Sequence, residues 1–528
     1  MLHVHTQSGK WGPFCRQIEE FLKADTIELC LDGIHIRGFR SPDTPALWIR
    51  DHSEILRGGK YVESDVRSAV SAFGDTQAAN GRIFDYVTTF PEKTPCEREN
   101  WEKWVRVPVE ADVEYRFVKA AFLAWQASGS EDWLDGRMPM LERALSYCTT
   151  HPWRWDDGHR LIKRPYTIDT WDFDYTAGAA PWLNFQVTDR TFWGIMHGDN
   201  SGFYEASGML GTMCRALGRS EDADRWSSTA EELRERANRL LFNGRFYTHF
   251  HKITPVTVDG VDESEQLSLS NPMAINRGLA THEMAVAILR EYRRRAETTD
   301  AFAEWFSIDP PFPDGIFGDE KLKGGAYVNG GILPLVGGEL ARAAFEHGFE
   351  RYAVDTLRQY AEMIAESGET YLWYFPDGTP STDEASTSPE ATPTDGWGSS
   401  AMLYAFVEGL CGITDLDHSY RRVRCAPRWV AAQEEAVSVD VSYADSGSGF
   451  GYTFRHRPDV AAMILELRAG ASDVDVQILL PDRARVTRTK WNERETAYSE
   501  KRVENSAYAC SRGSVRGEAR VEIQYSLA

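Results

Sequence analysis

Hydrophobic positions along the middle of the chain recur at helical spacing. Between about residues 61 and 415, apolar residues fall at i, i+3, i+4 and i+7, for instance in 108–127, 203–219 and 349–367. This spacing predicts amphipathic helices. Short turns join many of them and no fixed-period repeat is visible, so we expect antiparallel helical hairpins arranged in a closed ring rather than an open solenoid.

Two other regions alternate apolar and polar residues with a period of two. Residues 26–39, TIELCLDGIHIRGF, alternate around an Asp-Gly pair, which predicts a β-hairpin. After about residue 414, alternating segments separated by Gly, Ser and Asp predict an antiparallel β-sandwich. The expected fold is therefore mainly α, with a helical domain over 1–415, including the short N-terminal hairpin region, and a β-sandwich domain over 416–528.

Four long connections interrupt the helical pattern. They span 151–202, 243–280, 302–338 and 368–397 and are rich in Trp, Pro, Gly and Asp. Long ordered connections in a compact domain are usually functional. We expect them to gather at one end of the helical ring and to form a cleft.

The charge of the chain limits the classes of partner. Its formal net charge is −22, which opposes binding to phosphate backbones and to anionic lipid surfaces. Nucleic acid and membranes are therefore not expected as partners. Aromatic residues make up 12% of the chain, and Trp or Tyr beside carboxylates suits the stacking and hydrogen bonding of sugars, although a large core also uses aromatic rings. A small-molecule carbohydrate is the expected partner, and the oligomeric state is left open.

The cysteines and the common motifs give no sign of a metal or a cofactor. The eight cysteines include no C-x-x-C pair, so they are interpreted as free thiols of the core in a reducing compartment. The chain lacks a P-loop, an H-E-x-x-H and a G-x-S-x-G motif. Since the start also lacks an apolar signal segment and no membrane span is predicted, we expect a cytoplasmic protein.

Two acidic, aromatic segments are the main candidates for chemistry. They are IDTWDFDYTAG (168–178) and SGETYLWYFPDG (367–378). Hydrolysis of a glycosidic bond needs two carboxyl groups, and aromatic surroundings raise the pKa of the group that acts as the acid. Asp172 lies between two aromatic residues, and Glu369 is its candidate partner. Each also has a structural interpretation: a turn or cap carboxylate for Asp172, and an exposed loop charge for Glu369.

A third candidate is LWIRDH (47–52). Its adjacent Arg50 and Asp51 offer a donor and an acceptor that can bind sugar hydroxyls together. A structural salt-bridge network is the competing interpretation.

Taken together, the motifs resemble those of the six-hairpin glycosidases. LWIRDH resembles the W-x-R-D sugar-binding loop of glucoamylases, and TWDFDYTAG is similar to the general-acid loop of glucoamylases and of glycoside hydrolase family 63. YVNGG and GETYLWYFPDG…DGWGSSAMLYAFVEGL resemble two further loops of this clan, in the same order along the chain. The resemblance implies an (α/α)6-barrel catalytic domain, and the C-terminal β-sandwich resembles the one that follows this domain in α-L-rhamnosidases.

The resemblance also implies roles for individual residues. Asp172 would be the general acid, Glu369 the general base, and Arg50 with Asp51 part of the sugar-binding subsite. Asp174, two residues after Asp172, leaves the choice of acid between these two aspartates open. Further expected substrate-binding residues are Trp48, Trp171, Asp174, His197, Asn329, Tyr371, Trp373 and Trp397.

The expected function is that of an exo-acting, inverting glycoside hydrolase that removes a terminal α-glucoside-like or α-L-rhamnoside-like sugar. Three alternatives remain. A phosphorylase would need a phosphate pocket, for which Arg277, Ser399 and Ser400 are candidates. A polysaccharide lyase would need a base such as His197 or Tyr204. A non-catalytic sugar-binding protein would use the same aromatic loops without turnover.

Overall fold

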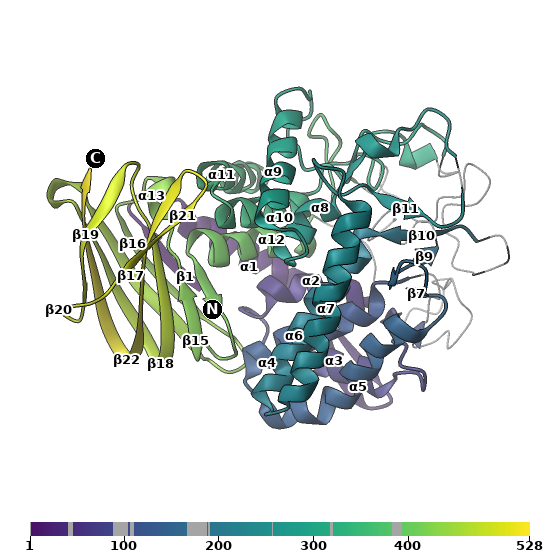
Figure 1. The fold of residues 1–528 in the computed structure, drawn as a ribbon, viewed down its shortest axis with the longest axis horizontal. Coiled ribbons are helices and arrows are strands. Elements are labelled where there is room, and N and C mark those ends of the chain that lie inside the picture. Colours follow the sequence, from purple (N-terminus) through teal and green to yellow (C-terminus); the bar gives the residue numbers. More distant parts are fainter. Residues whose placement is uncertain are drawn as a thin grey trace.

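The computed structural model describes residues 2–40, 46–87, 110–165, 187, 189, 191–255, 257–316, 320–382 and 393–527, together with the backbone of 104–105. Asp172, Trp171 and Asp174 lie outside these residues. A helical part and a large sheet lie side by side (Figure 1). This arrangement agrees with the prediction of a mainly helical chain that ends in antiparallel β-structure.

Six helices of the described chain contact one another in a closed sequence. Each contacts the next, and the last contacts the first again. In order, they are α2 (Ile49–Gly59), α4 (Val113–Ser128), α6 (His197–Ala216), α8 (Ser270–Asn276), α10 (Pro334–Glu346) and α12 (Gly396–Tyr404).

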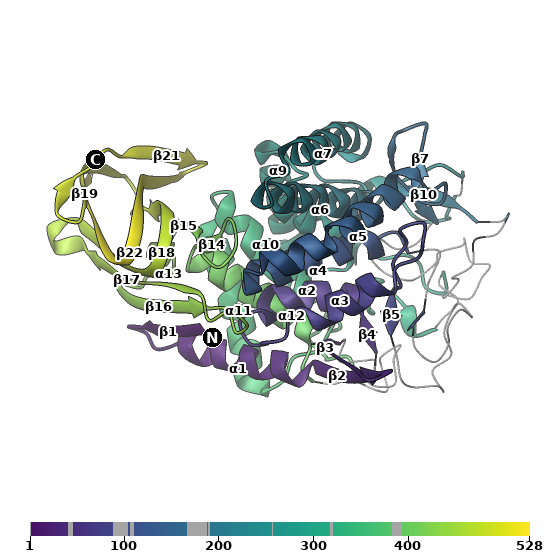
Figure 2. The same cartoon turned by 90° about the horizontal axis from the view of Figure 1, so that it is seen from below.

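A second set of helices packs against the outside of this ring. Each of them contacts one or two helices of the inner set, as Figure 2 shows for α3, α5 and α7. The outer helices are α1 (Trp11–Ala24), α3 (Ser68–Asp75), α5 (Glu131–Thr150), α7 (Ser220–Leu241), α9 (His282–Ala296) and α11 (Glu350–Ser367).

Burial follows this division into inner and outer helices. In the outer helix α7, the buried residues are Ala223, Trp226, Ala230, Leu233, Ala237 and Leu241, the spacing of a single apolar stripe. In the inner helix α2, all eleven residues are buried, including four charged ones. A helix buried on all sides cannot expose its polar groups to water, so these charges must find partners inside the ring.

Small residues allow two inner helices to approach closely. A Cβ added to Gly338 of α10 would lie 2.5 Å from the backbone carbon of Ala401 in α12. A Cβ at Gly337 would lie 2.6 Å from the ring of Trp305. Larger side chains at these glycines would therefore force α10 and α12 apart.

The sheet is built around two long strands. Ten strands of the described chain form one hydrogen-bonded sheet, in which β18 (Ala462–Leu479) pairs with β22 (Ser506–Leu527) over nearly its whole length. The first half of β18 pairs with β17 (Gly449–Arg457), and the second half with β15 (Arg422–Cys425). The irregularity between Ala469 and Ser472 separates these halves. The remaining strands are β1 (Leu2–Thr6), β14 (Ile413–Asp415), β16 (Ala436–Ser442), β19 (Ala484–Trp491), β20 (Arg494–Glu495) and β21 (Ser499–Val503).

The N-terminal strand belongs to this sheet although it lies at the other end of the sequence. Strand β1 pairs antiparallel with β16, with Leu2 opposite Val441. The sequence pattern did not predict this pairing. The division of the chain between residues 415 and 416 stays a prediction.

The predicted N-terminal hairpin is confirmed. Strands β2 (Thr26–Leu31) and β3 (Ile34–Phe39) pair antiparallel across a two-residue turn. Asp32 and Gly33 both have positive φ, at 54° and 83°. A type I′ turn requires this conformation, which explains why an Asp-Gly pair stands there.

The described cysteines and helices give two further findings. The seven cysteines in the described ranges are free, but Cys30 is exposed rather than buried in the core. Within the same ranges, no helix combines the length and the apolar character needed to cross a membrane.

Candidate active site

The first turns of several inner helices meet at one end of the ring. This end faces right in Figure 1, where β10 (Trp193–Met196) leads into α6. Tyr115 in the first turn of α4 packs so closely on α6 that a Cβ added to Gly202 would lie 2.2 Å from its ring. Helix N-termini carry partial positive charge, which favours carboxylates in their first turns. Asp51 and Asp199 occupy such positions in α2 and α6.

Arg50 and Asp51 point to different partners. The Arg50 guanidinium donates to both carboxylate oxygens of Asp112, at 2.6 and 2.7 Å, and to Glu110 at 2.6 Å. Asp51 accepts a hydrogen bond from the indole N–H of Trp397 at 2.9 Å. Both residues of the pair are less than 10% exposed. Arg50 therefore joins α2 to the start of α4, whereas Asp51 joins α2 to α12.

Glu369 follows directly after the C-terminus of α11. Gly368 ends this helix in the left-handed conformation, with φ at 74°. Glu369 is exposed, and its Oε2 accepts a hydrogen bond from the Tyr371 hydroxyl at 3.1 Å. An exposed carboxylate that is oriented by one donor can still contact water through its other oxygen. This arrangement is suitable for a general base.

Thr370 connects Glu369 to the start of α12. Its N–H donates to Pro393 O at 3.1 Å, and its carbonyl accepts from the N–H of Asp395 at 3.1 Å. Asp395 caps α12 by accepting from the N–H groups of Trp397 and Gly398. The structure thus brings the segment of Glu369 next to the helix turn that carries Trp397.

Asp25, which the sequence analysis did not select, supports the same turn. It accepts a hydrogen bond from the Thr394 hydroxyl at 2.8 Å. Burial, and the nearby charge of Asp395, raise the pKa of the Asp25 carboxyl well above its usual value. Asp25 is therefore neutral over a wider pH range than an exposed aspartate.

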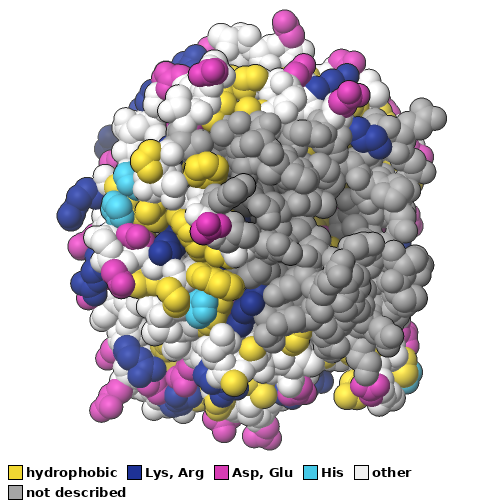
Figure 3. Space-filling view, turned by 90° about the vertical axis from the view of Figure 1, so that its right-hand side faces the viewer, with side chains coloured by type: hydrophobic (Ala, Val, Ile, Leu, Met, Phe, Trp, Pro, Cys, Tyr) yellow, Lys and Arg dark blue, Asp and Glu magenta, His cyan; other side chains and the backbone are white. Residues whose placement is uncertain are grey.

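Two other aromatic candidates, Trp48 and Trp373, pack against neighbouring tyrosine rings. The Trp48 ring lies against the Tyr86 ring, with centroids 4.0 Å apart. Trp373 is 1% exposed and stacks on Tyr327 at 6.0 Å. Figure 3 views this end and shows hydrophobic side chains along the border of the residues drawn in grey.

His197 and Asn329 are fully buried and make internal contacts. The His197 ring stacks on Tyr247 at 5.4 Å, and its Nδ1 lies 3.2 Å from Thr248 O. The Asn329 amide donates to Phe312 O at 3.1 Å and to Leu322 O at 3.0 Å, and accepts from Phe312 N–H at 2.7 Å. In this structure, Asn329 joins the backbone of Phe312 to that of Leu322.

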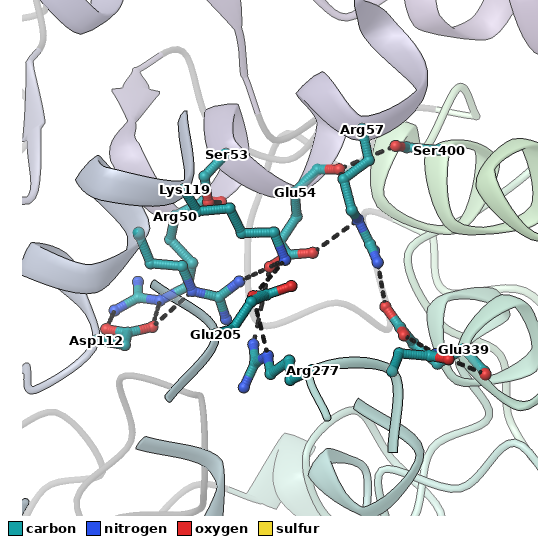
Figure 4. A network of polar contacts seen from close by, with 12 residues as sticks. Arg50, Ser53, Glu54, Arg57, Asp112, Lys119, Glu205, Arg277, Glu339 and Ser400 are labelled. Atoms are coloured by element: carbon teal, nitrogen blue, oxygen red, sulfur yellow. Dashed lines mark hydrogen bonds and ion pairs between the residues drawn. The ribbon is translucent and has the colours of Figure 1, made fainter. Parts of the chain in front are cut away.

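A network of charged residues lies in the interior of the helical ring (Figure 4). Its centre is Glu54, which pairs with Arg116, with Lys119 at 3.0 Å and with Arg57 at 2.9 Å. Glu205 pairs with Lys119 at 3.2 Å. The sequence analysis gave a salt-bridge network as one interpretation of Arg50 and Asp51, and Arg50 does pair with Asp112 and Glu110. It did not select Glu54 or Lys119.

The network shifts the protonation of its members. Burial lowers the pKa of Lys119 to about 7, although the carboxylate of Glu205 acts in the opposite direction. Burial also opposes ionisation of Glu205, but Lys119 and Arg277 outweigh this effect, and the pKa of Glu205 is lowered. Lys119 therefore loses its proton more readily than an exposed lysine does.

The candidates for a phosphate pocket are part of this interior. Arg277 donates to Gly198 O and to the Ser201 hydroxyl, both at 3.0 Å. The Ser400 hydroxyl accepts from Gly58 N–H at 2.9 Å. These groups are engaged in holding inner helices together. In the described ranges, no group of three or more His, Cys, Asp or Glu residues is placed to hold a metal ion.

The architecture has counterparts among known structures. An α-L-rhamnosidase from Dictyoglumus thermophilum matches 99% of this chain and 50% of its own, with a TM-score of 0.62 and 11% identity. An α-L-rhamnosidase from Streptomyces avermitilis matches 99% of this chain and 42% of its own, with a TM-score of 0.58 and 14% identity. This chain thus spans half or less of these two enzymes.

A third counterpart is shorter. The GH63 mannosylglycerate hydrolase from Thermus thermophilus matches 75% of this chain and 100% of its own, with a TM-score of 0.52 and 15% identity. No family model and no curated protein sequence matches the chain. The fold is therefore similar to that of these two α-L-rhamnosidases and of this mannosylglycerate hydrolase. At these identities the likeness establishes the fold, and the reaction must be argued from the site.

Proposed function

We propose that the protein is a glycoside hydrolase whose helical part is an (α/α)6 barrel, and that it removes a terminal sugar with inversion. The closed sequence of inner-helix contacts supports the barrel. The observation that carries the function is the meeting of two separate sugar-site candidates at one end of the ring. Asp51 and Trp397 join at 2.9 Å, and Thr370 ties Glu369 to the same turn.

In this proposal, Glu369 is the general base. Its hydrogen bond from Tyr371 fixes one carboxylate oxygen and leaves the other to activate a water molecule. Asp172 is the proposed acid, with Asp174 as the alternative. Inverting enzymes keep the two carboxyl groups roughly 6.5–9.5 Å apart, so that a water molecule fits between base and sugar.

The sugar contacts in the proposal come from Asp51 and the aromatic candidates. Carboxylates accept hydrogen bonds from sugar hydroxyls, and aromatic faces pack on the apolar face of the sugar ring. The printed names of the structural counterparts suggest α-L-rhamnosides and mannosylglycerate as first substrates to try.

The proposal is tested with a screen of aryl glycosides and oligosaccharides, followed by NMR of the first-formed anomer. Glu369→Gln and Asp172→Asn should each reduce kcat at least about a hundredfold, because general catalysis contributes roughly 10²–10⁴-fold. Glu366→Gln, an exposed change in the last turns of α11, is the matched control and should retain full activity. Full turnover in both catalytic variants on every cleaved substrate would refute the assignment, and a retained anomer would refute inversion.

A further inference from the structure

A deep groove lies where the helical part meets the sheet, remote from the candidate active site. Its volume is about 1030 Å³. Its walls come from α9, from the turn between α10 and α11, and from the β18–β19 and β21–β22 turns. Figure 2 shows β21 extending from the sheet toward the helices. None of the residues proposed for the hydrolytic reaction lines this groove.

Arginine dominates the lining. The groove contains six arginines, against the three acidic residues Glu350, Asp482 and Glu504. The arginines are Arg290, Arg293, Arg351, Arg483, Arg485 and Arg502.

The acidic residues already have partners. Glu350 is 5% exposed and accepts from the hydroxyls of Ser506, at 2.7 Å, and Tyr508, at 2.5 Å. Glu504 pairs with Arg290 at 3.1 Å, and Asp482 pairs with Arg351 at 2.8 Å. The carboxylates therefore do not neutralise the remaining arginines.

Four exposed arginines of the lining have no carboxylate partner among the described residues, and one of them, Arg293, lies over the Phe349 ring. The other three guanidinium groups are left for a ligand. Arg483, Arg485 and Arg502 are exposed, and their side chains make no ion pair with any residue in the described part of the chain. Two of them lie on separate strands, since Arg485 is in β19 and Arg502 in β21. Planar guanidinium groups bind carboxylates through two parallel hydrogen bonds.

The surroundings add to the positive potential. The first turn of the 18-residue helix α11 opens into the groove at Glu350 and Arg351. A helix N-terminus favours negative charge nearby. The net charge of the chain is −22, so the positive charge of this groove is opposite in sign to the charge of the whole chain. It would attract an anion that the rest of the surface repels.

We propose that this groove is a second carbohydrate site, which binds an acidic oligosaccharide through its uronate carboxylates. The excess of arginines in the groove is enough to imply a negatively charged ligand. That this ligand is a sugar rests on the proposed glycosidase function. The size agrees with an oligomer, because small-molecule pockets have volumes of roughly 300–1,000 Å³. The half-buried Phe349 in the lining offers an apolar surface for the non-polar face of a sugar ring.

Calorimetry on the full chain, with a three-unit galacturonate oligomer at low salt, tests the proposal. We expect binding that weakens as salt rises, and no binding of a neutral three-unit glucose oligomer. The double variant Arg485→Ser/Arg502→Ser should bind the acidic oligomer at least about tenfold more weakly, because it removes two of the guanidinium groups that would bind the carboxylates.

Arg488→Ser is the matched control. Arg488 is an exposed arginine of the same strand β19, but it pairs with Glu495 at 3.1 Å and lies outside the groove. The control should bind like the unchanged protein. The proposal is overturned if the acidic oligomer does not bind at millimolar concentration, if the double variant binds it equally well, or if inorganic phosphate binds as tightly, which would indicate a general oxyanion site.

The outcomes separate this proposal from the hydrolase assignment. The double variant should hydrolyse a small aryl glycoside at an unchanged rate, because the groove is remote from Glu369. A protein that binds the oligomer through Arg485 and Arg502 but cleaves no glycoside would refute the hydrolase while supporting the groove.

Discussion

The indole N–H of Trp397 donates a hydrogen bond to Asp51 at 2.9 Å, across a sequence separation of 346 residues. Asp51 lies in the first turn of α2 and Trp397 in the first turn of α12. Because these helices are neighbours in the closed ring, the bond fixes two walls of the candidate site relative to each other.

Trp397→Phe tests this relationship, since it keeps an aromatic ring but removes the donor. We expect kcat/KM for a cleaved glycoside to fall about tenfold or more, as a hydrogen bond to a charged group contributes roughly 1.5–3 kcal/mol. The control is Trp429→Phe, which removes a buried indole bond to the Tyr452 hydroxyl, at 2.7 Å, elsewhere in the molecule. An equal loss of kcat/KM in both variants would show that the effect is one of stability only.

Glu54→Gln should destabilise the helical ring. The change leaves Arg116, Lys119 and Arg57 without their shared anion, and breaking a buried ion pair costs about 3–5 kcal/mol. The measurement is the free energy of unfolding from urea denaturation. Glu232→Gln removes an exposed pair with Arg236 and should cost less than about 1 kcal/mol. Similar losses in the two variants would mean that the network contributes no more than a surface pair.

Asn329→Ala should destabilise the protein, because Asn329 joins the backbone of Phe312 to that of Leu322. The change removes two donors and one acceptor from buried backbone groups, which should cost about 3 kcal/mol of unfolding free energy. Asn505→Ala, at an exposed position, is the control and should change stability by less than about 0.5 kcal/mol. If Asn329→Ala keeps its stability but has a raised KM, the result would instead favour the predicted role of Asn329 in substrate binding.

Burial of His52 should make stability depend on pH. The ring is 1% exposed, its Nδ1 accepts from Phe39 N–H at 3.2 Å, and burial lowers its pKa to about 4. The unfolded chain, with a histidine pKa of about 6.5, binds a proton below that pH, while the folded chain does not. The free energy of unfolding should therefore fall as the pH drops from about 6.5 to about 4, by about 3 kcal/mol for this residue.

His52→Asn retains an acceptor for Phe39 but removes the titration. The variant should lose this part of the pH dependence when unfolding is measured by urea titration between pH 4 and pH 7. His5→Asn, at an exposed histidine of β1, should keep the full dependence. If His52→Asn unfolds with the unchanged pH profile, the buried ring is not the cause.

Local patterns predicted the parts of the fold that depend on neighbours in sequence. The Asp-Gly turn between β2 and β3 was predictable because two residues with positive φ need this chemistry. The apolar stripe of α7 was visible because an outer helix has one buried face and one solvated face. The inner helix α2 has no solvated face, since all its residues, including four charged ones, are buried.

The candidate site was predictable only in part. LWIRDH and the segment of Glu369 stood out by composition, but the sequence offered no partner for Arg50. The structure assigns it Asp112 and Glu110, which lie 62 and 60 residues away. It also places His197 and Asn329 in the interior, with hydrogen bonds to nearby backbone, a placement that their residue types do not reveal.

The sequence by itself determined the helical hairpins, the terminal β-structure and the acidic, aromatic character of the loops, because these follow from periodicity and turn chemistry. Only the tertiary structure decided that α12 closes on α2, that Asp51 meets Trp397, that β1 joins the C-terminal sheet, and that arginines of α9, α11 and two sheet turns share one groove. The physical reason is that these contacts join residues hundreds of positions apart. Their pairing is selected by the packing of whole elements, which no local pattern encodes.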